Sequence, residues 1–185
     1  AELLKATGIY YRNELRSIHK NGVKLQPVYE AFTNSWESIL EKYTAEHLNL
    51  GSIVIEFHYN VGMFEEDNEN NLKNLQKIII TDNGIGLNEE SFTRLLNLRD
   101  NSKSKNNKGT GRIQYLHYFD DTIFDSVYKV GDNNYRKICL TLSKKESFLQ
   151  ANAILRKDFD EETNIDNTYA KVELRTILDY KNDAK

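Results

Sequence analysis

The chain has 185 residues with 25 basic and 28 acidic side chains, so its formal net charge is -3. A balance so close to neutral excludes a strong overall field for attracting nucleic acid or an anionic membrane, although local contact with nucleic acid stays open. A single cysteine excludes an internal disulfide framework and favours a reducing compartment, the cytoplasm.

No stretch approaches the roughly 18 apolar residues needed to span a bilayer, so we expect no membrane partner. The length and a single proline predict one domain over residues 1–185, with an N-terminal helical arm at 1–22. The chain does not begin with methionine. We expect it to be the N-terminal part of a longer protein, whose downstream effector or transducer domain is missing.

Apolar spacing then predicts the elements in chain order. Helices are expected at 10–20, 26–48, 91–98 and 111–119, and strands at 53–59, 78–80, 123–130, 135–142 and 169–174. In the second helix, apolar residues step by three or four, which predicts a buried stripe that includes Phe32 and Trp36. Early helices and late strands favour an α+β class, with a sheet covered on one face by helices.

The long predicted helix carries Glu30 and Asn34 four residues apart, hence on one face, with Glu37 one turn further on. A carboxylate can take a proton from water, and an amide oxygen can ligate a hard cation such as Mg²⁺. The spacing therefore fits metal-assisted hydrolysis. The alternative is the solvated face of an amphipathic helix.

A second pattern, Asp82-Asn83-Gly84-Ile85-Gly86, directly follows the predicted strand at 78–80. An aspartate at the end of a buried strand can accept a hydrogen bond from a purine amine, and the glycines would let the backbone approach a flat base. The alternative is a tight turn, because Asn-Gly is a strong hairpin signal.

A basic, glycine-rich segment precedes the apolar run at 113–119. A glycine-rich turn that opens a helix presents backbone N–H groups to an anion, and the helix dipole adds to the attraction. The alternative is a flexible basic loop. The candidate phosphate-binding residues are Lys103, Lys108, Gly109, Thr110, Gly111 and Arg112.

The three patterns, in this order, resemble the superfamily of ATPases that contains gyrase, a chaperone family, histidine kinases and MutL. The match runs from about residue 27 to 174, and the stretch from Glu30 to Ser38 closely follows the superfamily's helix motif. The resemblance implies the Bergerat fold, a two-layer α+β sandwich with a mixed, largely antiparallel sheet covered on one face by helices. It also implies ATP and Mg²⁺ as cofactors.

By resemblance, Glu30 is the general base and Asn34 the Mg²⁺ ligand. Asp82 binds the adenine amine in a pocket shaped by Gly84, Ile85 and Gly86. Residues 98–110 form a lid over the triphosphate, which Lys103, Lys108, Gly109, Thr110, Gly111 and Arg112 help to bind. Thr168 supports the adenine-binding aspartate through water, although Asn167 stands where the superfamily usually has glycine.

The resemblance implies a slow, Mg²⁺-dependent ATPase that acts as a nucleotide-driven switch or dimerisation clamp for further domains. The sequence from Lys108 to Phe119 is closest in character to bacterial members, some of which serve phage defence, and this implies a defence role. Two alternatives stay open. One is a histidine-kinase-type catalytic domain, and the other is a module that senses nucleotide without hydrolysing it.

Overall fold

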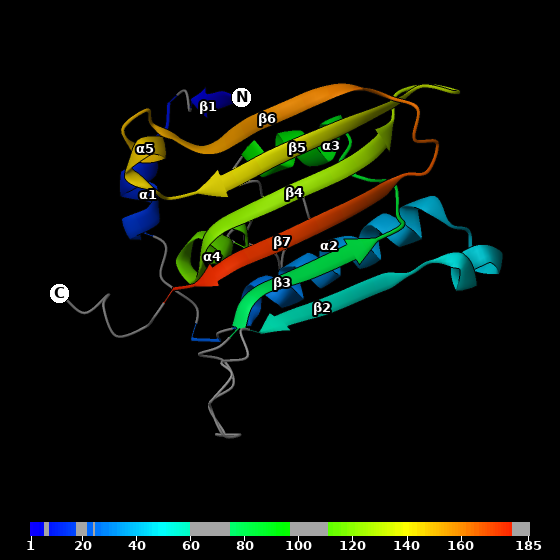
Figure 1. The fold of residues 1–185 in the computed structure, drawn as a ribbon, viewed down its shortest axis with the longest axis horizontal. Coiled ribbons are helices and arrows are strands. Elements are labelled where there is room, and N and C mark those ends of the chain that lie inside the picture. The colour runs from blue at the N-terminus through cyan, green and yellow to red at the C-terminus, as the bar shows by residue number, and fades with distance from the viewer. Residues whose placement is uncertain (6–7, 18–21, 24, 60–74, 97–110, 179–185) are drawn as a thin grey trace.

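The computed structural model describes the chain except for residues 6–7, 18–21, 24, 60–74, 97–110 and 179–185. The described part is built on one seven-stranded sheet with the strand order β1-β6-β5-β4-β7-β3-β2 (Figure 1). The strands are β1 (Glu2–Lys5), β2 (Ile53–Tyr59), β3 (Leu75–Asp82), β4 (Phe119–Lys129), β5 (Tyr135–Ser143), β6 (Ala153–Thr163) and β7 (Tyr169–Ile177).

The longer helices lie behind the sheet in the view of Figure 1, where α2 runs behind β3 and contacts α4. The short helices α1 and α5 lie together at one end of the sheet. No helix among the described residues is both long and apolar enough to cross a membrane. The helices are α1 (Tyr11–Ser17), α2 (Gln26–Lys42), the 3-10 helix η1 (Ala45–Leu50), α3 (Glu89–Leu96), α4 (Gly111–Tyr118) and α5 (Glu146–Leu149).

The core lies between the sheet and these helices. Alternate residues of each strand point to this side, because side chains in a strand alternate between faces. Ile78 and Ile80 of β3 are fully buried, and the register places Leu174 and Val172 of β7 opposite them on the same face. Val28 and Ala31 of α2 belong to the same apolar cluster.

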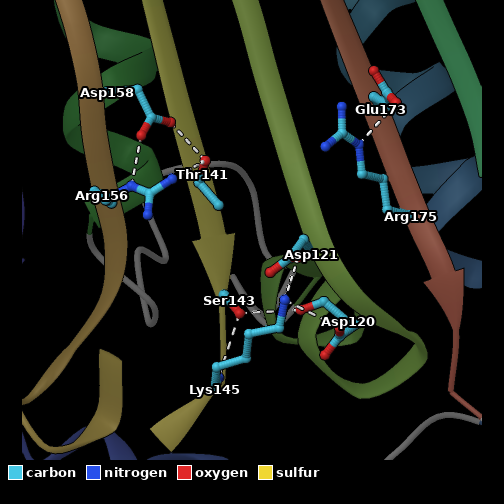
Figure 2. A network of polar contacts seen from close by, with 9 residues as sticks. All are labelled: Asp120, Asp121, Thr141, Ser143, Lys145, Arg156, Asp158, Glu173 and Arg175. Atoms are coloured by element: carbon cyan, nitrogen blue, oxygen red, sulfur yellow. Dashed lines mark hydrogen bonds and ion pairs between the residues drawn. The ribbon is translucent and has the colours of Figure 1, made fainter. Parts of the chain in front are cut away.

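The other face of the sheet carries charged and polar side chains in a network of ion pairs (Figure 2). Lys145 Nζ lies 2.5 Å from Asp121 Oδ2, and Arg175 Nε donates to Glu173 Oε1 over 2.8 Å. An antiparallel sheet can expose one face to water, so pairing these charges lets the face stay uncovered.

The expected fold class is wrong. Neighbouring strands in the described residues are all antiparallel, so the sheet is not mixed, and strands hold more residues than helices do. The chain is therefore more sheet-rich than the helix-covered α+β sandwich of the Bergerat type. Strands β1 and β6 were not predicted, β6 because most of its residues are charged, and the predicted start of β4 is four residues late.

The long helix also differs from its prediction. It ends at Lys42, because Tyr43 turns to an extended conformation, and the 3-10 helix η1 takes the place of its last predicted turn. Phe32 and Trp36 are each 43% exposed, so the predicted buried stripe is wrong at these two positions. The buried face instead runs through small side chains, among them Ala31 and Ser35.

Candidate functional site

The candidate site begins at Asp82, the last residue of β3, whose side chain is only 3% exposed. The backbone N–H of Gly84 donates a hydrogen bond of 2.9 Å to Asp82 Oδ1. The hydroxyls of Ser35 and Ser38, both on α2, also hydrogen-bond this carboxylate. The end of β3 is thereby joined to the helix behind it.

Ser38 connects Asp82 to the turn that follows it. Its hydroxyl oxygen accepts a hydrogen bond of 3.0 Å from the backbone N–H of Ile85, so the one hydroxyl serves both the carboxylate and the turn. The turn leads from β3 into α3 rather than into a neighbouring strand. Asn83-Gly84 therefore lies in a turn that does not connect two strands of a hairpin.

The charge of Asp82 is costly in this position. Burial raises the pKa of the Asp82 carboxyl above its usual value, while the hydrogen bonds from Ser35, Gly84 and Ser38 and the charge of Lys42 act in the opposite direction. Lys42 Nζ also donates to the backbone carbonyl of Asn83 over 2.6 Å. Perturbed carboxylates of this kind concentrate at functional sites, which favours a binding role for Asp82.

The two glycines of the turn have packing reasons of their own. A Cβ at Gly84 would collide with Ser38, and a Cβ at Gly86 would collide with the carbonyl oxygen of Val127. Gly86 also has a φ of 79°, a conformation that side chains disfavour. Packing within the protein accounts for both glycines, and the close approach of a base stays a prediction.

Thr168 lies at the same turn, just before β7. Its hydroxyl donates a hydrogen bond of 2.5 Å to the carbonyl oxygen of Gly84. Next to it, Ser126 of β4 donates to the carbonyl of Tyr169 over 2.6 Å and accepts the N–H of Leu87 over 2.8 Å. Three strands thus hold the turn after Asp82.

Glu30 and Asn34 extend the site along α2. With Ser38 they form a line of residues spaced by four, which lies on one face of the helix and spans about 12 Å. Asn34 is exposed, and Glu30 is half-buried with a hydrogen bond of 2.9 Å from Gln26 Nε2 to its Oε1. The line therefore runs from Ser38, which contacts the Asp82 carboxylate, to the carboxylate of Glu30.

The remaining predicted residues are only partly placed. Gly111 and Arg112 form the first turn of α4, which packs against α2. The rest of the predicted phosphate-binding set and the predicted lid at 98–110 lie outside the described residues. These are Lys103, Lys108, Gly109 and Thr110.

No protein-family model and no curated protein sequence matches this chain. Evidence for function therefore comes from the site itself. In the described residues, no group of three or more His, Cys, Asp or Glu side chains is arranged to hold a metal ion.

The predicted site residues did not include Ser35, Ser38 or Lys42, although the structure places all three around Asp82 and its turn. A signal was present, because two serines three residues apart in a helix interior are unusual unless their hydroxyls have partners. It was obscured by the assumption that the larger apolar residues Phe32 and Trp36 defined the buried face.

Proposed function

We propose that this chain binds ATP with Mg²⁺, with the adenine amine at Asp82 and the phosphates along the line from Ser38 to Glu30. The observation that carries the proposal is the buried Asp82 carboxylate. A carboxylate offers about four lone-pair sites. Gly84, Ser35 and Ser38 supply three donors, which leaves capacity for one donor from a ligand.

The side chains on α2 suit the chemistry of phosphate hydrolysis. Asn34 offers an amide oxygen to Mg²⁺, and the ion neutralises charge on the phosphates when it is bound. Glu30 can accept the proton of an attacking water, and the hydrogen bond from Gln26 restrains its carboxylate. The proposed activity is therefore a slow ATP hydrolase.

The proposed role is a switch or clamp that dimerises in response to nucleotide and passes the change to further domains. A cytoplasmic location fits the single cysteine and the need for ATP. We expect the isolated chain to turn over on the order of once per minute or less, because lid closure commonly limits the rate in enzymes of this kind.

The test is ATP turnover and nucleotide binding by Glu30→Gln. We expect at least a hundredfold loss of turnover, the scale of general-base catalysis, with binding of the nucleotide retained. The control is Glu41→Gln, which changes an exposed carboxylate on the same helix. Unchanged hydrolysis in Glu30→Gln would contradict the assignment of the base.

The same assay separates the alternatives. Radiolabel from ATP that appears on a histidine of a partner protein would favour a histidine-kinase domain. Nucleotide binding with no turnover in the wild-type chain would favour a nucleotide sensor.

A further inference from the structure

Helix α2 has an exposed apolar stripe as well as its buried face. The side chains of Tyr29, Phe32, Trp36 and Leu40 follow one another at helical spacing, and each is between 43% and 59% exposed. Four large apolar residues in a row are costly to leave in water. A contiguous patch of this kind usually marks an interaction surface.

The neighbouring strand β2 is exposed in the same way. It lies at an edge of the sheet and, among the described strands, pairs with β3 alone. Its side chains Ile55, Phe57 and Tyr59 are between 37% and 46% exposed. Ile55 and Phe57 stand opposite the buried Ile80 and Ile78 of β3, so both point to the α2 side of the sheet.

The stripe on α2 and the edge of β2 face the same way. Around α2, Ser38 faces the turn at Gly84, whereas Ile39 contacts Gly51, which lies between η1 and β2. At 100° per residue, the exposed stripe lies beyond Ile39, on the side away from Ser38. Helix and strand therefore form one continuous apolar surface, the α2–β2 surface, with Tyr29, Phe32, Trp36, Leu40, Ile55, Phe57 and Tyr59.

The two edges of the sheet differ in their protection. β1 is a strand of 4 residues with Glu2 and Lys5 at its ends, and short, charged edges resist pairing with another chain. β2 has 7 residues and is mostly apolar, and such an edge is a template for an added strand. The exposed parts of the seven side chains amount to roughly 600 Å² per protomer. Doubled, this reaches the lower limit of a stable interface.

We propose that the α2–β2 surface binds a second copy of this chain, with β2 paired antiparallel to β2 of the partner. Two antiparallel copies of one strand are related by a two-fold axis perpendicular to the sheet. This axis keeps the two α2 stripes on the same face of the joined sheet. The proposal goes beyond the nucleotide-driven dimer of the proposed function. It does not require that nucleotide bind at Asp82.

The charges on β2 favour a register with the axis at Phe57 over one with the axis at Glu56. Residue pairs in a two-fold strand pair must have an even sum of residue numbers, so that side chains opposite each other share a face. Placing the axis at Glu56 would put two like charges directly opposite each other, which is unfavourable. Placing it at Phe57 puts Glu56 opposite the partner's His58 and stacks the two Phe57 rings across the axis.

The first test uses the only tryptophan of the chain, Trp36. Sedimentation of the 185-residue chain should show a species of twice 21.6 kDa. Its formation should shift Trp36 emission to the blue and protect it from acrylamide. Phe57→Asp should raise the dissociation constant at least tenfold. The matched control Phe159→Asp changes a similarly exposed Phe at 37% on β6 and should not.

Three results would overturn the proposal. The first is a monomer at all concentrations, whether or not Trp36 is protected from acrylamide. The second is a dimer in which Trp36 emission is unchanged. The third is a dimer that Phe57→Asp leaves intact. A dimer whose melting temperature does not respond to adenine nucleotide would instead count against the ATP site alone. The two proposals can therefore fail separately.

The second test fixes the register by disulfide capture, in a Cys139→Ser background. Phe57→Cys places two thiols opposite each other across the axis, within about 5.5 Å between Cβ atoms, and should oxidise to a covalent dimer. Glu56→Cys should oxidise far more slowly. In this register the two cysteines at position 56 are diagonal to each other, on the face of the sheet opposite Phe57. Faster capture through Cys at position 56 would overturn the proposed register.

Discussion

The hydroxyl of Thr168 donates a hydrogen bond of 2.5 Å to the carbonyl oxygen of Gly84, across a separation of 84 residues. This contact joins the start of β7 to the turn after Asp82. It places the last of the predicted site residues beside the first of the predicted base pocket. Its role in nucleotide binding stays a prediction.

Thr168→Val tests that contact with little change in shape. Loss of one hydrogen bond should cost about 1 kcal/mol of stability, which lowers the melting temperature by about 2 to 4 °C. If the turn holds the base, affinity for an ATP analogue should fall as well. The control is Thr33→Val, whose hydroxyl bonds only within α2. An unchanged affinity, measured by calorimetry, would separate Thr168 from the site.

Ser38→Ala tests how Asp82 is positioned. The change removes a donor to the Asp82 carboxylate and leaves the N–H of Ile85 without its acceptor. We expect affinity for a non-hydrolysable ATP analogue to fall roughly tenfold, the scale of a hydrogen bond to a charged group. Ser17→Ala, which removes an exposed hydroxyl on α1, should leave the affinity unchanged. Wild-type affinity in Ser38→Ala would contradict the positioning role.

Gly86→Ala should be strongly destabilising because an added Cβ has no room there, and Gly8→Ala is the control for the backbone strain alone. Both glycines have almost the same positive φ, 79° and 78°, but a Cβ at Gly8 meets nothing within 4 Å. Strain alone should cost Gly8→Ala about 1 to 2 kcal/mol. Gly86→Ala should cost about 3 kcal/mol or more, since the carbonyl of Val127 belongs to the sheet and cannot move aside. Urea denaturation measures both, and equal losses would contradict the packing argument.

The raised pKa of Asp82 predicts a pH dependence of stability. Between the unfolded pKa, near 3.9, and the higher folded value, the native state binds more protons than the unfolded state. The free energy of unfolding therefore falls as pH rises through this window, by about 1.4 kcal/mol for each unit by which the pKa is raised.

Asp82→Asn should remove this dependence. Without nucleotide, its stability relative to wild type should increase as pH rises from about 4 and should level off above the folded pKa. Denaturation curves across that range measure the difference. A difference between the two proteins that stays constant with pH would show that the Asp82 pKa is not raised.

The sequence predicted the local elements of the site better than the fold. The helix with Glu30 and Asn34, the strand before Asp82 and the strand after Thr168 are all present. Their contact around Gly84 was implied by the resemblance alone. Periodicity describes one element at a time, and the hydrogen bond from Thr168 depends on how β3 and β7 pair.

The errors have physical causes in particular residues. β6 was missed because its many charged residues are not typical of a strand. In the structure these charges are paired, as Arg156 is with Asp158, and the strand can therefore form. Phe32 and Trp36 were predicted in the buried stripe because they continue its spacing of three or four residues. The face of α2 that packs on the sheet instead needs small residues such as Ala31 and Ser35.

The decisive experiment for the ATP site is thermal unfolding with and without Mg²⁺ and a non-hydrolysable ATP analogue, on wild type and Asp82→Asn. A ligand at about 100 times its dissociation constant adds roughly 2.7 kcal/mol, or about 5 to 10 °C for a chain of this size. We predict such a shift in wild type and in the control Asp132→Asn, with a guanine analogue inactive, and its loss in Asp82→Asn. No shift in wild type, or an equal shift in Asp82→Asn, would contradict the ATP site.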